Sequence, residues 1–173
     1  EVWSILAAFG SFGFCKAHGA AFAIPTYQSA WLKTHHPEAF MAALFEHDPG
    51  MYPQRLLIAE ARRLGIPLLP LDVNASSTSF KLERIPEHAQ TPSEPVPGYR
   101  VRGDLGIRMS WTLVSGLSTP EAQRLSANAP YTSVADVRSR ARITKASMVR
   151  LAQLGALDRF LTPGRGGRAD LIH

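Results

Sequence analysis

One short stretch of sequence decides the fold: Leu113-Val114-Ser115-Gly116-Leu117-Ser118-Thr119-Pro120-Glu121. Gly116 predicts a tight turn that ends one segment. Ser118 and Glu121 have the spacing of a capping box, and Pro120 fits the first turn of the helix that follows. The stretch therefore predicts a helical hairpin, in which a glycine turn leads into the start of a new helix.

Such a hairpin has a chemical consequence. Backbone N–H groups at the start of its second helix lack intrahelical partners, and together with the helix dipole they can bind a DNA phosphate. Gly116, Leu117, Ser118 and Thr119 are therefore candidates for a DNA contact that reads no base, with Arg124 as an electrostatic aid. The same residues also fit a plain packing corner between two helices, and the pattern alone leaves both interpretations open.

The residues after this hairpin predict a second one. Tyr131-Thr132-Ser133 starts a helix, and Thr144 caps another helix that ends at Gly155. Between them lies Arg142-Ile143-Thr144-Lys145, where a glycine turn would be expected. We therefore expect Arg142, Thr144 and Lys145 to contact a DNA backbone mainly through the basic side chains of Arg142 and Lys145, and less as a phosphate cradle. Residues 112–161 are interpreted as one domain of two successive helical hairpins.

The middle of the chain, residues 66–111, changes from helical to extended patterning. Two prolines within Ile66–Asn74 exclude a regular helix and favour a short strand, and further extended runs cover Ser76–Ile85 and Val101–Trp111. Residues 86–98 between these runs are rich in proline and polar residues, which predicts an exposed and mobile loop. The predicted fold class is therefore mainly α with a small antiparallel β ribbon.

The first part of the chain, residues 1–65, has apolar residues at helical spacing. A short apolar segment comes first, and the pattern then predicts helices from about Lys16 to His36, from Pro37 to Asp48 and from Pro53 to Gly65. Each helix has an apolar stripe, and we expect the three to pack together through these stripes.

The start of the first of these helices combines a cation and an imidazole. Lys16 and His18 lie two residues apart on the Gly- and Ala-rich background of Phe14–Ala23. Small residues allow close approach of a ligand, while a lysine charge and histidine donors suit a phosphate. Taken alone, the ten residues favour ordinary helix packing.

The amino-acid composition favours some classes of function and excludes others. A net charge of +5 with a pI near 9.8 fits a nucleic-acid-binding protein. The single cysteine, Cys15, excludes an internal disulfide, and no Cys/His spacing indicates structural zinc. No pair of aspartates suits two-metal chemistry, so we predict neither a catalytic residue nor a metal site in this chain.

Three further features concern location and chain ends. No run of about 20 apolar residues and no secretory signal is present, which predicts a cytoplasmic protein without a membrane partner. The start at Glu1 without methionine indicates a piece of a longer protein. Residues 162–173, which include Arg165 and Arg168, predict a flexible basic tail.

The motifs, taken in order, resemble the fingers region of bacterial C-family DNA polymerases, the family of the DNA polymerase III alpha subunit. The resemblance covers nearly the whole chain and rests on the order of many modest motifs. These are Gly13-Phe14-Cys15-Lys16-Ala17-His18, Tyr27-Gln28-Ser29-Ala30-Trp31-Leu32-Lys33, His36-Pro37-Glu38-Ala39-Phe40-Met41-Ala42-Ala43, Ala61-Arg62-Arg63-Leu64-Gly65-Ile66, Pro70-Leu71-Asp72-Val73-Asn74, Gly106-Ile107-Arg108 and Val114-Ser115-Gly116-Leu117. Residues 47–53, HDPGMYP, are more similar to the error-prone paralogue than to the replicative subunit.

This resemblance implies a domain assignment and a function. Residues 1–65 would be the C-terminal part of the fingers domain, and residues 112–161 a tandem helix-hairpin-helix domain that binds primer-template DNA. Lys16 and His18 would face the primer terminus and the incoming dNTP. The whole protein would be a nucleotidyltransferase in DNA replication and repair after DNA damage, through translesion synthesis.

The same resemblance also implies what this chain lacks. The palm aspartates that bind Mg²⁺ would precede Glu1, so the fragment itself would hold no cofactor and would be inactive alone. A sliding clamp or other mutasome proteins would bind through regions outside the chain. The alternative is a non-catalytic DNA-binding or protein-interaction helical module, which the absence of catalytic groups favours.

Overall fold

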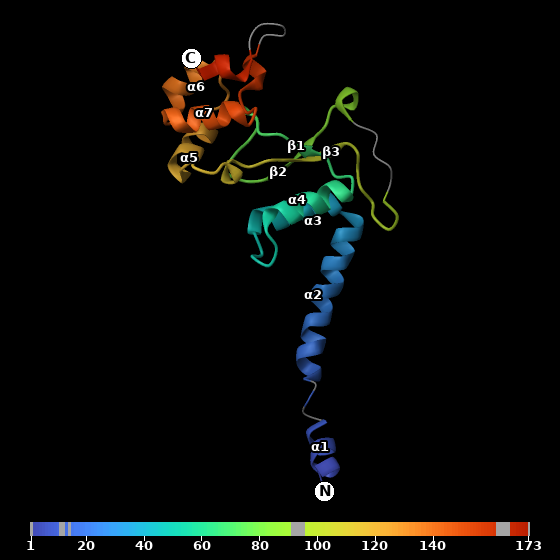
Figure 1. The fold of residues 1–173 in the computed structure, drawn as a ribbon. Coiled ribbons are helices and arrows are strands. Elements are labelled where there is room, and N and C mark those ends of the chain that lie inside the picture. The colour runs from blue at the N-terminus through green and yellow to red at the C-terminus, as the bar shows by residue number, and fades with distance from the viewer. Residues whose placement is uncertain (1, 11–12, 14, 91–95, 162–166, 173) are drawn as a thin grey trace.

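The computed structural model describes residues 2–10, 13, 15–90, 96–161 and 167–172. They form a mainly helical fold with one small sheet, which confirms the predicted fold class (Figure 1). The α-helices are α1 (Val2–Gly10), α2 (Lys16–His35), α3 (Pro37–His47), α4 (Gln54–Arg63), α5 (Thr119–Ala127), α6 (Val134–Ala141) and α7 (Lys145–Gln153). The strands are β1 (Leu68–Leu69), β2 (Lys81–Arg84) and β3 (Leu105–Arg108), and the 3₁₀ helices are η1 (Glu87–Ala89), η2 (Trp111–Leu113), η3 (Asp158–Phe160) and η4 (Arg168–Ile172).

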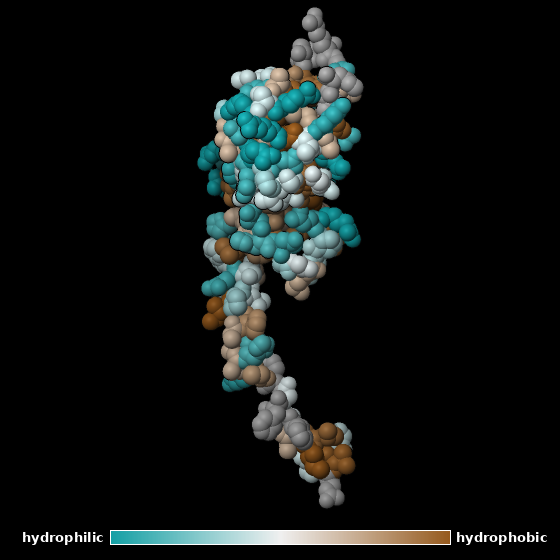
Figure 2. All heavy atoms as spheres, turned by 90° about the vertical axis from the view of Figure 1, so that its left-hand side faces the viewer, coloured by the Kyte–Doolittle hydropathy of each residue, from teal (hydrophilic) through white to brown (hydrophobic). Residues whose placement is uncertain are grey.

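Helix α2 extends away from the rest of the molecule, with α1 beyond its far end (Figure 1). None of its residues is buried, and Ile24 and Tyr27 of its apolar stripe are 65% and 71% exposed. Figure 2 shows hydrophobic residues gathered at the α1 end, whereas hydrophilic residues cover much of the main body. The prediction that three helices pack together is therefore wrong for α2. An apolar stripe identifies a face that can be buried, but no described element lies against it.

The corner between α2 and α3 is a defined joint. His36 leaves helical geometry with φ −138° and ψ 56°, and Pro37 then starts α3, where a missing N–H costs nothing. Lys33 Nζ donates to Glu60 Oε1 of α4 at 2.9 Å, and Arg100 N donates to the carbonyl oxygen of Thr34 at 2.8 Å. The end of α2 is thus fixed to α4 and to the chain before β3.

Helices α3 and α4 pack together over one face of the sheet, as predicted for this pair. Their core is entirely apolar and consists of Met41, Phe45, Leu57, Ala61, Leu64, Ile66 and Ile107. Because alternate strand residues point to the same face, Leu68 and Leu82, which pair with Ile107, lie on its side of the sheet. Burial of a side chain such as Ile107 is worth roughly 1.5–3 kcal/mol.

The sheet differs in one respect from the predicted ribbon. Its strand order is β1-β3-β2, and β2 pairs with β3 antiparallel as expected. However, β1 pairs with β3 in parallel, with Leu68 opposite Ile107. The sheet is mixed rather than antiparallel because β3, the last strand in the chain, lies between the other two and runs parallel to β1 and antiparallel to β2.

The C-terminal helices surround a second core. Its fully buried side chains include Trp111, Leu125, Val137, Leu151 and Leu157. Val73, from the segment after β1, also belongs to this core, and its N–H donates to the carbonyl oxygen of Ala156 at 2.9 Å. The extended middle of the chain is therefore anchored to the hairpins by both apolar and backbone contacts.

Two predicted segments lie partly outside the described residues. Of the loop 86–98, residues 91–95 are not described, and residues 87–89 form η1. Of the tail 162–173, residues 162–166 and 173 are not described. The part that is described forms η4, whose Arg168 Nε donates to Asp158 Oδ1 at 2.8 Å, so this exposed segment is held against the domain by an ion pair. None of the helices in the described ranges is both long and apolar enough to cross a bilayer.

Candidate nucleic-acid interface

The first hairpin turn has the predicted geometry. Gly116 has φ +84°, a left-handed conformation that favours glycine, and Leu117 N donates to the carbonyl oxygen of Val114 at 3.1 Å. Ser118 then caps α5 in the predicted capping box with Glu121. A Cβ atom on Gly116 would have nothing within 4 Å, so the outer surface of the turn is open.

The second turn has the same kind of backbone without a glycine. Arg142 follows the end of α6 with φ +48°, which costs a non-glycine residue about 1 kcal/mol. Thr144 then caps α7, and its Oγ1 accepts from Ser147 N at 3.1 Å. Two helix N-termini are therefore each preceded by a left-handed turn, although only the first has a glycine at that position.

Arg124 explains how the second turn keeps this conformation. Its Nε donates to the carbonyl oxygen of Ala141 at 2.9 Å, and its Nη2 donates to that of Arg142 at 3.1 Å. These carbonyls end α6 and would otherwise lack intrahelical donors. Arg124, predicted as a DNA contact, thus has an internal partner at the turn itself.

The two turns are joined by one buried carboxylate, that of Glu121, which is 5% exposed. Its Oε2 accepts from Ser118 N at 3.0 Å and from Ser118 Oγ at 2.8 Å. Its Oε1 accepts from Thr144 N at 2.8 Å and from Ser147 Oγ at 3.0 Å. Burial raises the pKa of Glu121, but the hydrogen bonds from Thr144, Ser118 and Ser147 outweigh it and lower the pKa to about 2. The capping-box spacing predicted only the contact with Ser118.

Several backbone donors at these turns remain available. Within the described ranges, the N–H groups of Gly116 and Thr119 at the first turn have no acceptor, and neither do those of Lys145 and Ala146 at the second. They stand at or beside the positive ends of α5 and α7, where an anion is stabilised. The N–H groups of Ser118 and Thr144, by contrast, are occupied by Glu121.

The charges around the turns are unbalanced. Residues 112–161 contain seven Lys or Arg and three acidic residues. Glu121 is buried, Asp136 accepts from Arg140 at 3.1 Å, and Asp158 accepts from Arg168. The charged side chains of this domain without a hydrogen bond or ion pair to any residue of the described part are those of Arg138, Arg142, Lys145 and Arg150. The hairpin domain therefore presents uncompensated positive charge.

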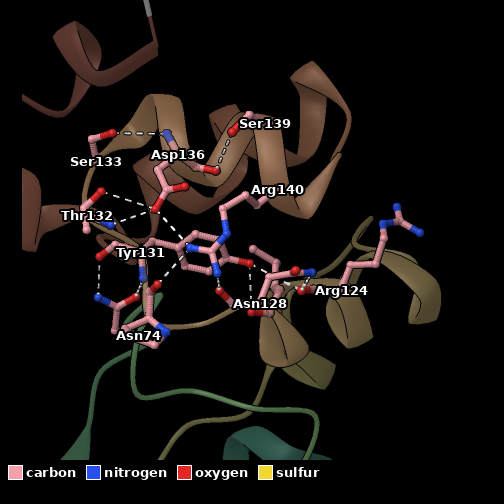
Figure 3. A network of polar contacts seen from close by, with 11 residues as sticks. Asn74, Arg124, Asn128, Tyr131, Thr132, Ser133, Asp136, Ser139 and Arg140 are labelled. Atoms are coloured by element: carbon pink, nitrogen blue, oxygen red, sulfur yellow. Dashed lines mark hydrogen bonds and ion pairs between the residues drawn. The ribbon is translucent and has the colours of Figure 1, made fainter.

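A polar network behind the turns fixes the hairpins to the middle segment (Figure 3). Asn74 accepts from Tyr131 N at 2.7 Å and donates to the carbonyl oxygen of Tyr131 at 2.8 Å. The Tyr131 hydroxyl donates to the carbonyl oxygen of Leu125 at 3.0 Å, and the Arg140 guanidinium lies 5.1 Å from its ring centre. The backbone N–H of Thr132, then Arg140, lower the pKa of Asp136. Arg140 therefore has a structural role.

Lys16 and His18 lie far from this surface. They are exposed in the first turn of α2, at the opposite end of the molecule from the hairpins (Figure 1). Cys15 precedes the helix without a side-chain cap, and the first turn contains no acidic residue. The His18 ring contacts the Phe22 ring at 4.5 Å between centroids. The predicted site residues thus form two separate groups, one at each end.

Among the residues that the structure describes, no three His, Cys, Asp or Glu side chains are grouped so that they could hold a metal ion. The carboxylates nearest the two turns are also unsuitable, because Glu121 is fully engaged by four donors.

Comparison with known proteins points to one group. Residues 65–167 match the model of a family described as the helix-hairpin-helix motif. The error-prone DNA polymerase of Teredinibacter turnerae is 39% identical over 153 residues, which are 86% of this chain and 14% of that protein. Those of Corynebacterium efficiens and Symbiobacterium thermophilum are 36% and 34% identical over 91% and 99% of this chain, and 13% and 17% of their own lengths. The predicted resemblance is confirmed, and the chain spans less than a fifth of these relatives.

Proposed function

The chain belongs to the helix-hairpin-helix motif family, and from this premise we propose that it is the part of an error-prone DNA polymerase that holds primer-template DNA by its backbone. Its function would be to keep the duplex in place without reading base sequence. Such a role suits synthesis in repair and across damaged templates, because a backbone contact is unaffected by changes in the bases.

One observation carries this proposal: the two left-handed turns lie side by side, each opening a helix with free N–H groups. Thr119 at the first turn and Lys145 at the second offer these donors, and both helix dipoles add to the attraction of an anion. Arg142, Lys145 and Arg150, which pair with no residue of the described part, lie at and beyond the second turn. A surface of this kind binds phosphate oxygens and displaces counterions.

Each predicted DNA-contact residue has a place in this proposal. Gly116 and Thr119 offer N–H groups to a first phosphate, while Leu117 packs partly against the core and Ser118 caps α5. At the second turn the side chains of Arg142 and Lys145 supply charge, and Thr144 caps α7. Arg124 holds the second turn through two carbonyls, so its role is in positioning.

Lys16 and His18 would act at a different place, on the incoming dNTP. They stand at the positive end of a 20-residue helix that has neither a side-chain cap nor an acidic residue in its first turn. The Mg²⁺-dependent transfer itself would use residues of the polymerase other than those described, and the chain alone would not polymerise. Clamp or mutasome contacts, and a cytoplasmic location, are part of the same proposal.

The test measures the affinity of the 173-residue chain for two labelled 24-base-pair duplexes of unrelated sequence. Binding is monitored by fluorescence anisotropy at several salt concentrations. We expect equal affinity for both duplexes and a steep loss of affinity with salt, about 0.9 in log–log slope for each phosphate contacted. Lys145→Ala should reduce the slope by about 1, while the matched change Lys16→Ala should leave it unaltered. Affinity that is independent of salt would contradict the proposal.

A protein-interaction module is the second candidate. The exposed apolar side chains of α1 and α2 favour it, since Trp3 is 82% and Tyr27 71% exposed. Under this alternative, reversal of the charges at Lys16, Arg124 and Lys145 would leave partner capture intact, and no DNA would be retained.

A further inference from the structure

Two side chains of helix α5 contact the second turn, one where the turn begins and one where it ends. Arg124 donates to the carbonyls of Ala141 and Arg142, where α6 ends. Glu121 accepts from Thr144 N, where α7 begins. The two side chains are three residues apart and therefore lie on one face of α5. One helix thus fixes the turn between two others.

The chemistry at Glu121 admits only a carboxylate. Its four partners are donors, and each oxygen serves one turn: Oε2 binds Ser118 of the first, and Oε1 binds Thr144 and Ser147 of the second. A hydroxyl can rotate and become an acceptor, but the backbone N–H groups of Ser118 and Thr144 cannot. A glutamine has one acceptor oxygen, so its amide nitrogen would oppose one of these N–H groups.

We propose that Glu121 is a positioning residue that joins the two turns into a single bivalent clamp for two DNA phosphates. The inference rests on the proposed binding of the DNA backbone. Because Ser118 N and Thr144 N contact the same carboxylate within 3.0 Å, the distance between the two phosphate sites is fixed before DNA arrives. Binding of the first phosphate then presents the second site at a high effective concentration.

The charge of Glu121 is compatible with this role. The carboxylate is buried between the positive ends of α5 and α7, which offset its charge. It occupies the N–H groups of Ser118 and Thr144, and leaves those of Thr119 and Lys145 for phosphates. Glu121 therefore acts on DNA only through the turns and does not itself touch it.

The experiment compares the wild-type chain with Glu121→Gln and with the control Asp136→Asn, using one 24-base-pair duplex between 50 and 200 mM NaCl. The control removes the same charge near the start of α6, where Asp136 binds Thr132 and Arg140. For Glu121→Gln we expect roughly tenfold weaker binding and a log–log slope lower by about 0.9 per lost phosphate. Asp136→Asn should keep the wild-type slope.

The outcomes separate the two proposals. If the wild-type chain shows no salt-dependent binding, the proposed function itself fails. If the wild type binds and Glu121→Gln keeps its slope, the clamp is overturned, even if affinity falls equally at every salt concentration, because a loss of folded protein has that effect. Should Glu121→Gln not fold, Glu121→Asp keeps the charge but shortens the side chain by one methylene, which weakens the link between Ser118 N and Thr144 N, and decides the question. A lowered slope supports the clamp, and an unchanged slope overturns it.

Discussion

Helix α2 and the hairpin helices differ in what holds them in place. With 20 residues, α2 is the longest α-helix in the described part of the chain, yet it buries none of them. Helix α7 has nine residues and buries four, Ser147, Met148, Leu151 and Ala152. Length therefore does not measure how firmly a helix is held. Short helices gain their stability from packing and from bonds at their ends.

The largest expected effect on stability comes from the same type of substitution, leucine to alanine, made separately in each region. Leu151→Ala opens a cavity in a fully buried site and should lower the free energy of unfolding by about 2–5 kcal/mol. Leu32→Ala on α2, where the side chain is 44% exposed, should cost less than about 1 kcal/mol. Urea denaturation measures both changes. Equal losses would show that α2 is packed as tightly as the hairpins.

The pH dependence of stability tests the same contrast, because each region contains one carboxylate whose pKa is lowered to about 2. The pKa of Glu121 falls from its ordinary 4.5 to about 2, because its hydrogen bonds outweigh burial. Its ionised form then contributes about 3 kcal/mol, present above pH 4.5 and lost as the pH falls toward 2. The difference in unfolding free energy between wild type and Glu121→Gln should therefore shrink over that range, as measured by urea denaturation at each pH.

Glu60, at the base of α2, is the comparison for this acid effect. Its hydrogen bonds to Arg63 and then Lys33 lower its pKa to about 2 as well, but its side chain is 28% exposed. Solvent screens that ion pair, so Glu60→Gln should change stability by less than about 1 kcal/mol at any pH. A Glu60 effect as large as that of Glu121 would contradict the distinction between the two regions.

The smallest expected effect concerns the second turn. Arg142→Gly removes the strain of a left-handed arginine and should raise the unfolding free energy by up to about 1 kcal/mol. The same change removes a cation, so DNA affinity should fall while stability rises. Gly116→Ala at the first turn should instead lower stability by about 1 kcal/mol. Thermal unfolding with anisotropy measures both, and a destabilised Arg142→Gly would show that the turn is unstrained.

Local signals account for the parts of the fold that the sequence predicts correctly. Gly116 and the capping box of Ser118 and Glu121 specify the first turn within six residues. Pro37 and the run from Asp48 to Gly50 likewise mark the two ends of α3. In each case the residues that define the structure are neighbours along the chain.

Contacts between distant residues account for what the sequence missed. The second turn lacks a glycine, and its conformation is held by Arg124, which lies 18 residues before Arg142. The bond from Thr144 N to Glu121 spans 23 residues, so capping-box spacing gives no sign of it. The parallel pairing of β1 with β3 likewise joins residues that are far apart in the sequence. Whether a distant element covers the apolar stripe of α2 is also not visible in the residues of α2 themselves. Periodicity identifies an apolar face but not what covers it.

Because α2 is held at the joint near His36, a change in its angle at that end moves its other end. Twenty residues at 1.5 Å each place Lys16 about 30 Å from that joint, so a tilt of about 10° moves Lys16 by about 5 Å. The bonds from Lys33 to Glu60 and from Arg100 to Thr34 resist this tilt within the last turn of the helix. Small angular changes at one end of α2 are therefore amplified into displacements of a whole side-chain length at the other.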